Sequence, residues 1–160
     1  MTEHPPIICI VGQSGSGKTT LIEGLLTGLN KRGYRVGTIK HHSHDDFEID
    51  HEGKDTWRHA KAGAETISIS SPTMFAIIKK VNKELTLDEI AGYMEDRDVI
   101  LADGYTSSEK PRIVINTEPG DIVHFGRGKE IVATIDSPFN EEQLLRIIDL
   151  VEARINIVGP

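Results

Sequence analysis

The sequence predicts an α/β fold in which helices cover both faces of a mainly parallel sheet, with a β-ribbon as an extension. Two observations predict this fold. Apolar runs typical of buried strands alternate along the chain with segments of helical periodicity, an order typical of parallel sheets. The first such run, 7–11, leads directly into residues 12–19, which read G-Q-S-G-S-G-K-T and match the phosphate-binding pattern G-x-x-x-x-G-K-[ST]. Together these features indicate a P-loop NTPase-type fold.

The remaining elements follow from periodicity, capping residues and turn residues. A helix is expected to begin at Lys18, with leucines at helical spacing, and to end at Gly33. Thr86, with Glu89 three residues later, predicts a capping box ahead of another helix, and Asn140 is expected to cap the last one. Further strands are expected at 35–40, 65–70, 74–80, 99–102, 112–116, 121–125 and 131–135, and helices at 54–62, 87–95 and 141–154. Of these strands, 65–70 is expected to pair with 74–80 as a hairpin, and 112–116 is expected to pair with 121–125 as a second antiparallel pair.

Length and composition predict one nucleotide-binding domain over residues 1–160, working in the cytoplasm. A chain of 160 residues is long enough to bury a core without disulfides. Its net charge of −7 argues against nucleic acid or an acidic membrane surface as a partner, since both favour a basic face. Cys9 is the only cysteine, so an internal disulfide is excluded and a reducing compartment is favoured. No stretch approaches 18 apolar residues, so no membrane span is expected.

The phosphate loop predicts binding of a nucleoside triphosphate together with Mg²⁺. Its glycines let backbone N–H groups surround the β-phosphate, Lys18 can reach the β- and γ-phosphates, and the Thr19 hydroxyl can ligate Mg²⁺. The alternative is a merely flexible Gly/Ser-rich turn, and the strand before the loop and the helix after it argue against that alternative. The expected nucleotide-binding residues are Gly12, Gln13, Ser14, Gly15, Ser16, Gly17, Lys18, Thr19 and Thr20.

A carboxylate at the end of a buried strand is expected to complete the metal site. Asp103 closes the apolar run 99–102 and is therefore the candidate ligand for Mg²⁺, directly or through water. Asp98 begins the same strand and would lie at the opposite edge of the sheet, where capping of the strand entry is the better interpretation. A turn residue ahead of Gly104 is the alternative for Asp103.

Residues 40–59 hold a second cluster of polar side chains, including five of the seven histidines. Metal binding has to be considered, but no histidine pair has a recognisable ligand spacing and no cysteine accompanies them. The alternative is a second anion or substrate site, formed by Lys40, His41, Lys54 and Arg58, with Asp50 as a catalytic base. A solvated helix face explains Lys54 and Arg58 equally well from their spacing. The candidate catalytic residues are Asp50, Asp103 and Lys18.

Several segments outside the loop resemble one known family. Residues 38–41 read T-I-K-H, residues 53–64 read G-K-D-T-W-R-H-A-K-A-G-A, residues 100–105 read I-L-A-D-G-Y, and residues 110–113 read K-P-R-I. With Asp50 and the phosphate loop, they resemble the molybdopterin-guanine dinucleotide biosynthesis protein B (MobB) family over about 7–136. The resemblance implies a GTP-binding accessory protein with weak GTPase activity, usually a homodimer. Its implied partners are GTP, molybdopterin or its guanine dinucleotide, and the enzyme that joins GMP to molybdopterin.

Two positions depart from the pattern of that family. The family usually has Glu-Gly after the buried strand and a basic residue two positions beyond the glycine, whereas this chain has Asp103-Gly104 and Thr106. Aspartate remains a hard oxygen ligand, so metal binding is expected to survive this change. The threonine puts in doubt any pterin or phosphate contact made at that position.

The choice of base, the activity and the assembly stay open at this stage. Asp136 follows residues 132–135, which read V-A-T-I, and could accept hydrogen bonds from guanine N1 and N2, although a turn before the last helix explains it equally well. A nucleotide-dependent adaptor without turnover and a small-molecule kinase are the rivals to a weak GTPase. Segment 111–125 is expected to form an exposed ribbon that pairs with a second copy of the chain by strand addition.

Overall fold

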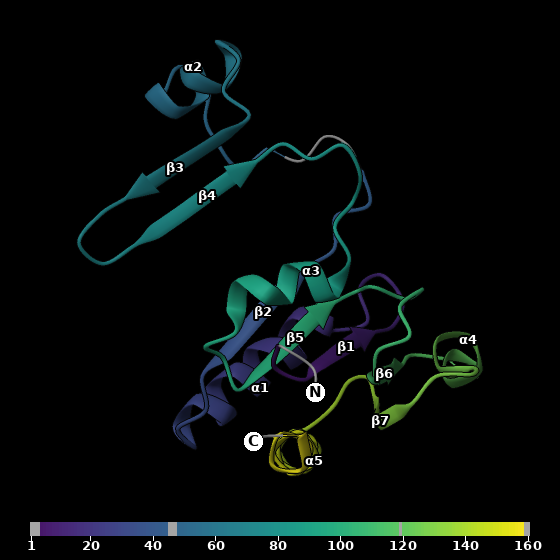
Figure 1. Cartoon of the computed structure of the whole chain (residues 1–160). Helices are drawn as coiled ribbons and strands as arrows, with labels where there is room; N and C mark the ends of the chain where they lie inside the picture. The colour runs from purple at the N-terminus through teal and green to yellow at the C-terminus, as the bar shows by residue number, and fades with distance from the viewer. Residues whose placement is uncertain (1–3, 45–47, 119, 159–160) are drawn as a thin grey trace. The chain divides into compact units, whose positions relative to one another are not determined.

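The structure is a computed structural model that describes residues 4–44, 48–118 and 120–158. The chain forms two compact units, one made of residues 1–41 with 87–160 and the other of residues 42–86. Figure 1 shows both units. That the whole chain acts as one nucleotide-binding domain stays a prediction.

The first unit is built on a five-stranded parallel sheet, as the sequence predicts. Its strands lie in the order β2 (Val36–Lys40), β5 (Val99–Asp103), β1 (Ile7–Val11), β6 (Arg112–Asn116) and β7 (Ile131–Asp136). The chain passes from β1 outward to β2, returns to β5 and then crosses over β1 to β6 (Figure 1). In such a sheet, ligands bind outside the carboxyl ends of the strands where the order reverses, which is the edge at which β1 ends.

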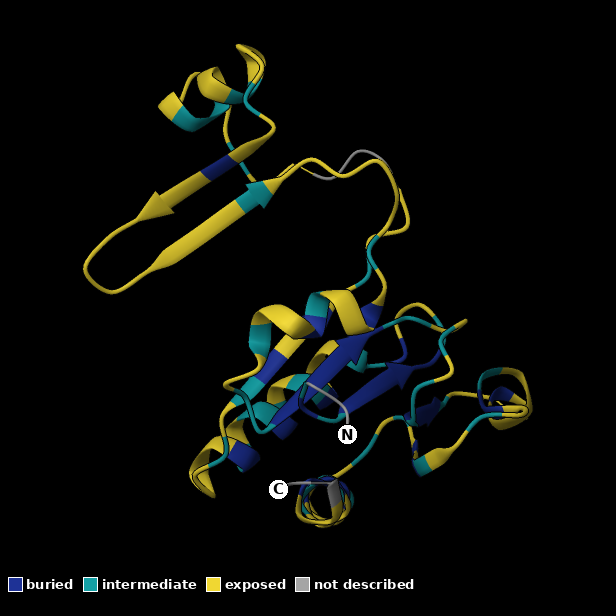
Figure 2. Ribbon diagram, viewed as in Figure 1, coloured by how far each residue is buried: buried dark blue, intermediate teal, exposed yellow. Residues whose placement is uncertain are grey.

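Helices cover both faces of this sheet because the central strands are apolar on both sides. On one face, Ile8 and Ile10 pack with α1 (Lys18–Lys31) and α5 (Glu141–Val158). On the other face, Cys9 packs with α3 (Leu87–Ala91), which continues as the 3₁₀ helix η1 (Gly92–Met94). Figure 2 shows the central strands as buried. None of the described helices, α5 included, is long and apolar enough to cross a membrane.

The prediction that 112–116 pairs antiparallel with 121–125 is wrong. Segment 112–116 is instead the interior strand β6, which lies parallel to β1 and β7 with Ile113 beside Ile10 and Ile115 beside Ile135. Residues 112–115 are all buried, which is typical of a strand inside a parallel sheet. Segment 121–126 is the helix α4 (Asp121–Gly126), which begins after a left-handed Gly120. The prediction of an exposed ribbon over 111–125 is therefore wrong as well.

The second unit holds the hairpin that the sequence predicts, and this hairpin is the β-ribbon extension. Strands β3 (Thr66–Ser70) and β4 (Phe75–Lys79) pair antiparallel, with Ile67 opposite Ile78. Helix α2 (Asp55–Lys61) contacts β3, and Ile67 is the buried residue of that strand. On α2 the Lys61 ammonium lies 5.2 Å from the centre of the Trp57 ring.

Candidate nucleotide-binding site

The phosphate loop joins the central strand β1 to helix α1 at the carboxyl edge of the sheet. Gly15 and Gly17 have φ values of +75° and +95°, which favour glycine. A Cβ on Gly12 would lie 2.8 Å from Ser16 Oγ and 3.0 Å from the Ile115 carbonyl oxygen, so a side chain there would require the neighbouring backbone to move. The loop is thus a tight turn that ends at a helix N-terminus, where unpaired N–H groups favour an anion.

Lys18, the first residue of α1, extends back over this loop. Its Nζ donates to the carbonyl oxygens of Gly12 at 3.0 Å and Gln13 at 2.6 Å. Burial lowers the pKa of Lys18, the Asp103 carboxylate opposes this effect, and the Lys40 charge adds to it. The ammonium group therefore lies over the loop and within the electrostatic field of a neighbouring carboxylate.

Asp103 ends β5, the strand next to β1, and lies beside Ile10 in the register. The residue is buried, and its Oδ2 accepts a hydrogen bond from Lys40 Nζ at 2.5 Å. Its Oδ1 is buried and has no hydrogen-bond partner among the residues that the structure describes. Asp98 lies at the other end of the same strand, where it accepts a hydrogen bond from the Arg35 backbone N–H at 2.6 Å. Asp103 is therefore the carboxylate of β5 that lies at the edge of the phosphate loop.

His41, one of the residues predicted for a second anion site, also lies at this edge. Its backbone N–H donates to the Asp103 carbonyl oxygen at 3.1 Å, and its ring centre lies 4.7 Å from that of Tyr105. Lys54, Arg58 and Asp50 belong to the second unit. The second anion or substrate site expected for Lys54 and Arg58, and the role of Asp50 as a catalytic base, stay predictions.

The histidine cluster forms no metal centre among the residues in ranges 4–44, 48–118 and 120–158. No group of three or more His, Cys, Asp or Glu side chains suited to a metal ion occurs there. The rings of His42 and His44 lie edge to face at 5.9 Å.

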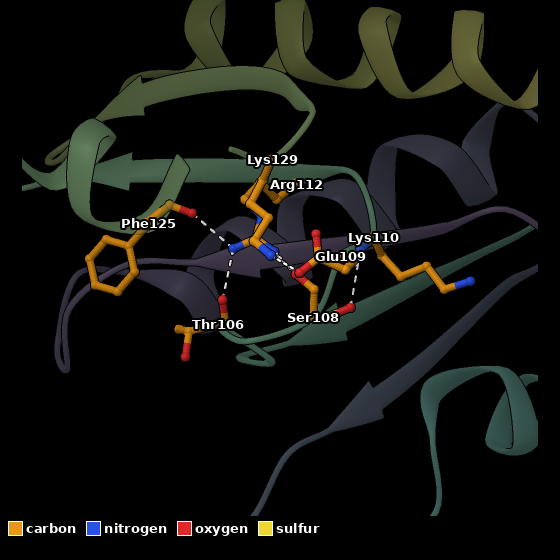
Figure 3. Close-up of polar contacts among 7 residues, drawn as sticks. All are labelled: Thr106, Ser108, Glu109, Lys110, Arg112, Phe125 and Lys129. Atoms are coloured by element: carbon orange, nitrogen blue, oxygen red, sulfur yellow. Dashed lines mark hydrogen bonds and ion pairs between the residues drawn. The ribbon is translucent and has the colours of Figure 1, made fainter. Parts of the chain in front are cut away.

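Arg112, which lies in one of the segments that carry the family resemblance, is a residue to which the sequence reasoning assigned no role. The side chain is fully buried, and Nη1 donates to the carbonyl oxygens of Thr106 at 3.0 Å and Phe125 at 2.8 Å, while Nη2 donates to that of Ser108 (Figure 3). The guanidinium group therefore ties the loop that follows Asp103 to the end of α4. A charged residue at the start of an otherwise apolar strand was the available signal.

A second contact missed by the sequence reasoning joins the phosphate loop to α4. Gln13 Nε2 donates to Asp121 Oδ1 at 3.0 Å and to Glu118. Asp121 is buried, and its Oδ2 also accepts hydrogen bonds from the Thr117 backbone at 2.8 Å and the Thr117 hydroxyl at 2.9 Å. Chiefly because of the Thr117 backbone N–H, and then of Gln13, the pKa of Asp121 falls to about 2. A charged carboxylate thus fixes the position of the Gln13 side chain.

The fold and this loop define a P-loop-type α/β protein. The chain belongs to the family described as molybdopterin guanine dinucleotide synthesis protein B (MobB), whose family model matches residues 7–137. The membership expected from the sequence is therefore confirmed.

Relatives and solved structures agree with this assignment. The molybdopterin-guanine dinucleotide biosynthesis adapter protein of Haemophilus influenzae is 36% identical over 120 residues, which are 74% of this chain and 67% of that protein. Its Escherichia coli counterpart is 36% identical over 114 residues, 69% of this chain and 65% of the relative. The matched segments thus span about two thirds of these relatives.

A crystal structure of molybdopterin-guanine biosynthesis protein B superposes on this chain with a TM-score of 0.75 at 30% sequence identity, and the match covers 94% of this chain and 99% of that structure's chain. The Bacillus subtilis MobB structure has a TM-score of 0.74 at 28% identity, with 93% and 97% coverage.

Thr106, one of the two positions that depart from the family pattern, takes part in the contacts of Arg112 through its backbone. The exposed Thr106 contributes its backbone carbonyl to the Arg112 guanidinium group. Because a backbone carbonyl is present whatever the side chain, this contact does not depend on threonine at that position.

Proposed function

We propose that this protein binds GTP with Mg²⁺, hydrolyses it slowly and acts as an accessory protein in the synthesis of molybdopterin guanine dinucleotide. The observation that carries the proposal is the position of the Asp103 carboxylate, at the end of the strand beside β1 and thus at the edge of the phosphate loop. Relatives that are named adapter proteins of molybdopterin-guanine dinucleotide biosynthesis support the biological setting.

The side chains at this edge fit a magnesium ion. Asp103 offers a buried Oδ1 that accepts no hydrogen bond from the described residues, and Thr19 offers a hydroxyl in the first turn of α1. Such oxygen ligands are those that Mg²⁺ prefers. The ion, when bound, would neutralise charge that develops on the β- and γ-phosphate oxygens. Lys40 holds the other carboxylate oxygen of Asp103 and so fixes the orientation of that group.

The protein itself supplies the remaining groups for the phosphates. Residues 12–20 would surround the β-phosphate with backbone N–H groups, and Lys18 would donate to the β- and γ-phosphate oxygens. The burial that lowers the pKa of Lys18 also reduces the hydration of its ammonium group, which strengthens its attraction to a phosphate.

Slow hydrolysis is proposed because no arginine finger or water-positioning glutamine is evident in the sequence, and the contacts of the glutamine in the loop agree with this proposal. A GTPase with high activity needs a group that orients the attacking water, commonly a glutamine, and an arginine that stabilises the transition state. Here the Gln13 carboxamide is held by Asp121 and Glu118, 108 and 105 residues away in the sequence. Its amide nitrogen is therefore engaged by Asp121 and Glu118.

We also propose that the protein works as a homodimer and acts beside a guanylyl-transferring enzyme on molybdopterin or its guanine dinucleotide. The family resemblance is the basis for both statements. The hairpin supports self-association, since Phe75 is 69% exposed and Ile69 and Ile77 are about half exposed. Sedimentation that shows only monomer at micromolar concentration would contradict the dimer.

Product analysis tests the proposed activity. The protein would be incubated with GTP or ATP, with Mg²⁺ or with EDTA, and with or without molybdopterin, and both free phosphate and phosphorylated acceptor would be measured. We expect slow release of phosphate to water from GTP that stops with EDTA. A phosphorylated acceptor would instead identify a kinase, and binding without turnover would identify a nucleotide-dependent adaptor.

A further inference from the structure

A pocket of about 360 Å³ lies at the carboxyl ends of β6 and β7, within the first unit. Asn116, Glu118, Asp136 and Ser137 are among the residues that line it. A volume of this order lies within the usual range for small-molecule sites and is larger than a nucleobase.

This pocket adjoins the phosphate loop at two points. The Gln13 side chain donates to Glu118, which lines the pocket. At the other end of the loop, a Cβ on Gly17 would lie 3.8 Å from the Ser137 hydroxyl oxygen. A ligand whose phosphates occupy the loop can therefore place its other end in this pocket.

The polar groups that line the pocket include hydrogen-bond acceptors, among them the carboxylate of the exposed Asp136, which a neighbouring side chain holds in place. Asn116 Nδ2 donates to Asp136 Oδ1 at 3.0 Å, which orients the carboxylate. The Asn116 Oδ1 atom is buried and accepts no hydrogen bond from any described residue. The described residues that line the pocket include two carboxylates, Glu118 and Asp136, and no lysine or arginine. Such a pocket favours a ligand edge that carries donors.

We propose that this pocket is the base subsite and that Asp136 selects guanine over adenine. The proposal rests on the proposed function, because it presupposes phosphates in the loop. Guanine presents two adjacent donors, N1–H and the N2 amino group, which match the two oxygens of one carboxylate. Adenine places an unprotonated N1 at the corresponding position, so the carboxylate would face an acceptor and lose its hydrogen bond. Asn116 is a positioning residue, since it acts on the base through the Asp136 carboxylate.

The variant Asp136→Asn tests this proposal, because it should weaken binding of GDP and strengthen binding of XDP. The amide keeps one acceptor for Asn116 Nδ2 and for the base N1–H, but its amino group now opposes the guanine N2 amino group. Xanthine carries a carbonyl oxygen at that position and accepts the new donor. A bidentate contact to a base edge is worth about 10- to 100-fold in discrimination. We therefore expect a loss of this size in GDP affinity and a gain in XDP affinity.

Titration calorimetry with GDP, ADP and XDP would measure these ratios for the wild type and the variant. Asp96→Asn is the matched control, because it makes the same chemical change at an exposed carboxylate that forms an ion pair with its neighbour Arg97. The control is expected to keep the wild-type preference for GDP over ADP. In the variant, recovered XDP binding would also show that the protein is folded.

The outcomes separate failure of the base subsite from failure of the proposed function. Equal wild-type affinities for GDP and ADP, or an unchanged ratio in Asp136→Asn, would overturn the base subsite while leaving the phosphate loop in place. Wild-type protein that binds none of the three nucleotides, nor tripolyphosphate, would overturn the proposed function and this inference with it.

Discussion

Replacement of Arg112 by methionine is expected to destabilise the protein strongly, although the volume of the side chain is nearly kept. The guanidinium group is fully buried and donates to three backbone carbonyls, those of Thr106, Ser108 and Phe125. Methionine would fill the space but leave these three acceptors without a donor. A buried polar group left unpaired costs about 1–3 kcal/mol, and this cost applies chiefly to the carbonyls of the partly buried Ser108 and Phe125, since Thr106 is exposed.

The loss of stability in Arg112→Met is partly offset, because the charge of Arg112 is itself costly to bury. No carboxylate pairs with it among the described residues, and methionine removes the penalty for desolvating its charge, which is several kcal/mol. We expect the cost of the unpaired carbonyls to exceed this penalty, with a net loss of about 3 kcal/mol. For a domain whose total stability is about 5–15 kcal/mol, this is a large fraction.

Urea denaturation followed by circular dichroism would measure this effect. With an m-value of about 2 kcal/mol/M, the midpoint for Arg112→Met should fall by roughly 1.5 M. Arg154→Met, which removes a surface ion pair with Glu130, is the matched control and should change stability by less than about 1 kcal/mol. A midpoint for Arg112→Met within about 0.3 M of the wild type, with an unchanged m-value, would refute the role assigned to the three carbonyl contacts.

Three further predictions follow from the site. Asp103→Asn should reduce Mg²⁺-dependent GTP hydrolysis more than nucleotide affinity, measured side by side, and a larger effect from Asp98→Asn would contradict the assignment of the metal ligand. The double variant Lys54→Ala with Arg58→Ala should keep GDP affinity but lose GTP hydrolysis or stimulation of the partner enzyme; normal results in all three assays would identify an exposed helix face. The pKa of Asp121 is lowered from 3.8 to about 2, so its contribution to stability is present above about pH 4 and is lost as the pH falls toward 2. The difference in urea midpoint between wild type and Asp121→Asn should therefore shrink between pH 5 and pH 2, and a constant difference would contradict the prediction.

Local signals in the sequence predict those parts of the fold in which neighbouring residues determine the structure. The apolar run 7–11 with its glycine-rich loop predicts β1, the turn and α1, and the hairpin 66–79 follows from its turn residues. Asn140 caps the last helix as expected, since its Oδ1 accepts a hydrogen bond from the Gln143 N–H at 2.9 Å. These features depend on contacts within a few residues.

The features missed by the sequence reasoning depend on contacts between distant segments. Residues 121–125 alternate in a way that is typical of a strand, but Asp121 accepts hydrogen bonds from the Thr117 backbone and from Gln13, and the segment forms α4. Periodicity over five residues does not separate these possibilities. The link between Gln13 and Asp121 spans 108 residues, and no pattern in a single sequence indicates it. The burial of Arg112 depends likewise on the fold that brings α4 beside β6.

Calorimetric titration of the wild type and of Lys18→Ala with GTP and Mg²⁺ tests the central claim most directly. In the proposed function Lys18 would supply charged hydrogen bonds to the phosphates, each worth about 1.5–3 kcal/mol, so its removal should weaken GTP binding by roughly 10- to 100-fold while the protein stays folded. Lys31→Ala, at the exposed end of the same helix, is the control and should bind GTP as the wild type does. Wild-type protein that binds no GTP, or folded Lys18→Ala with unchanged GTP affinity, would contradict the assignment of this loop as a triphosphate site.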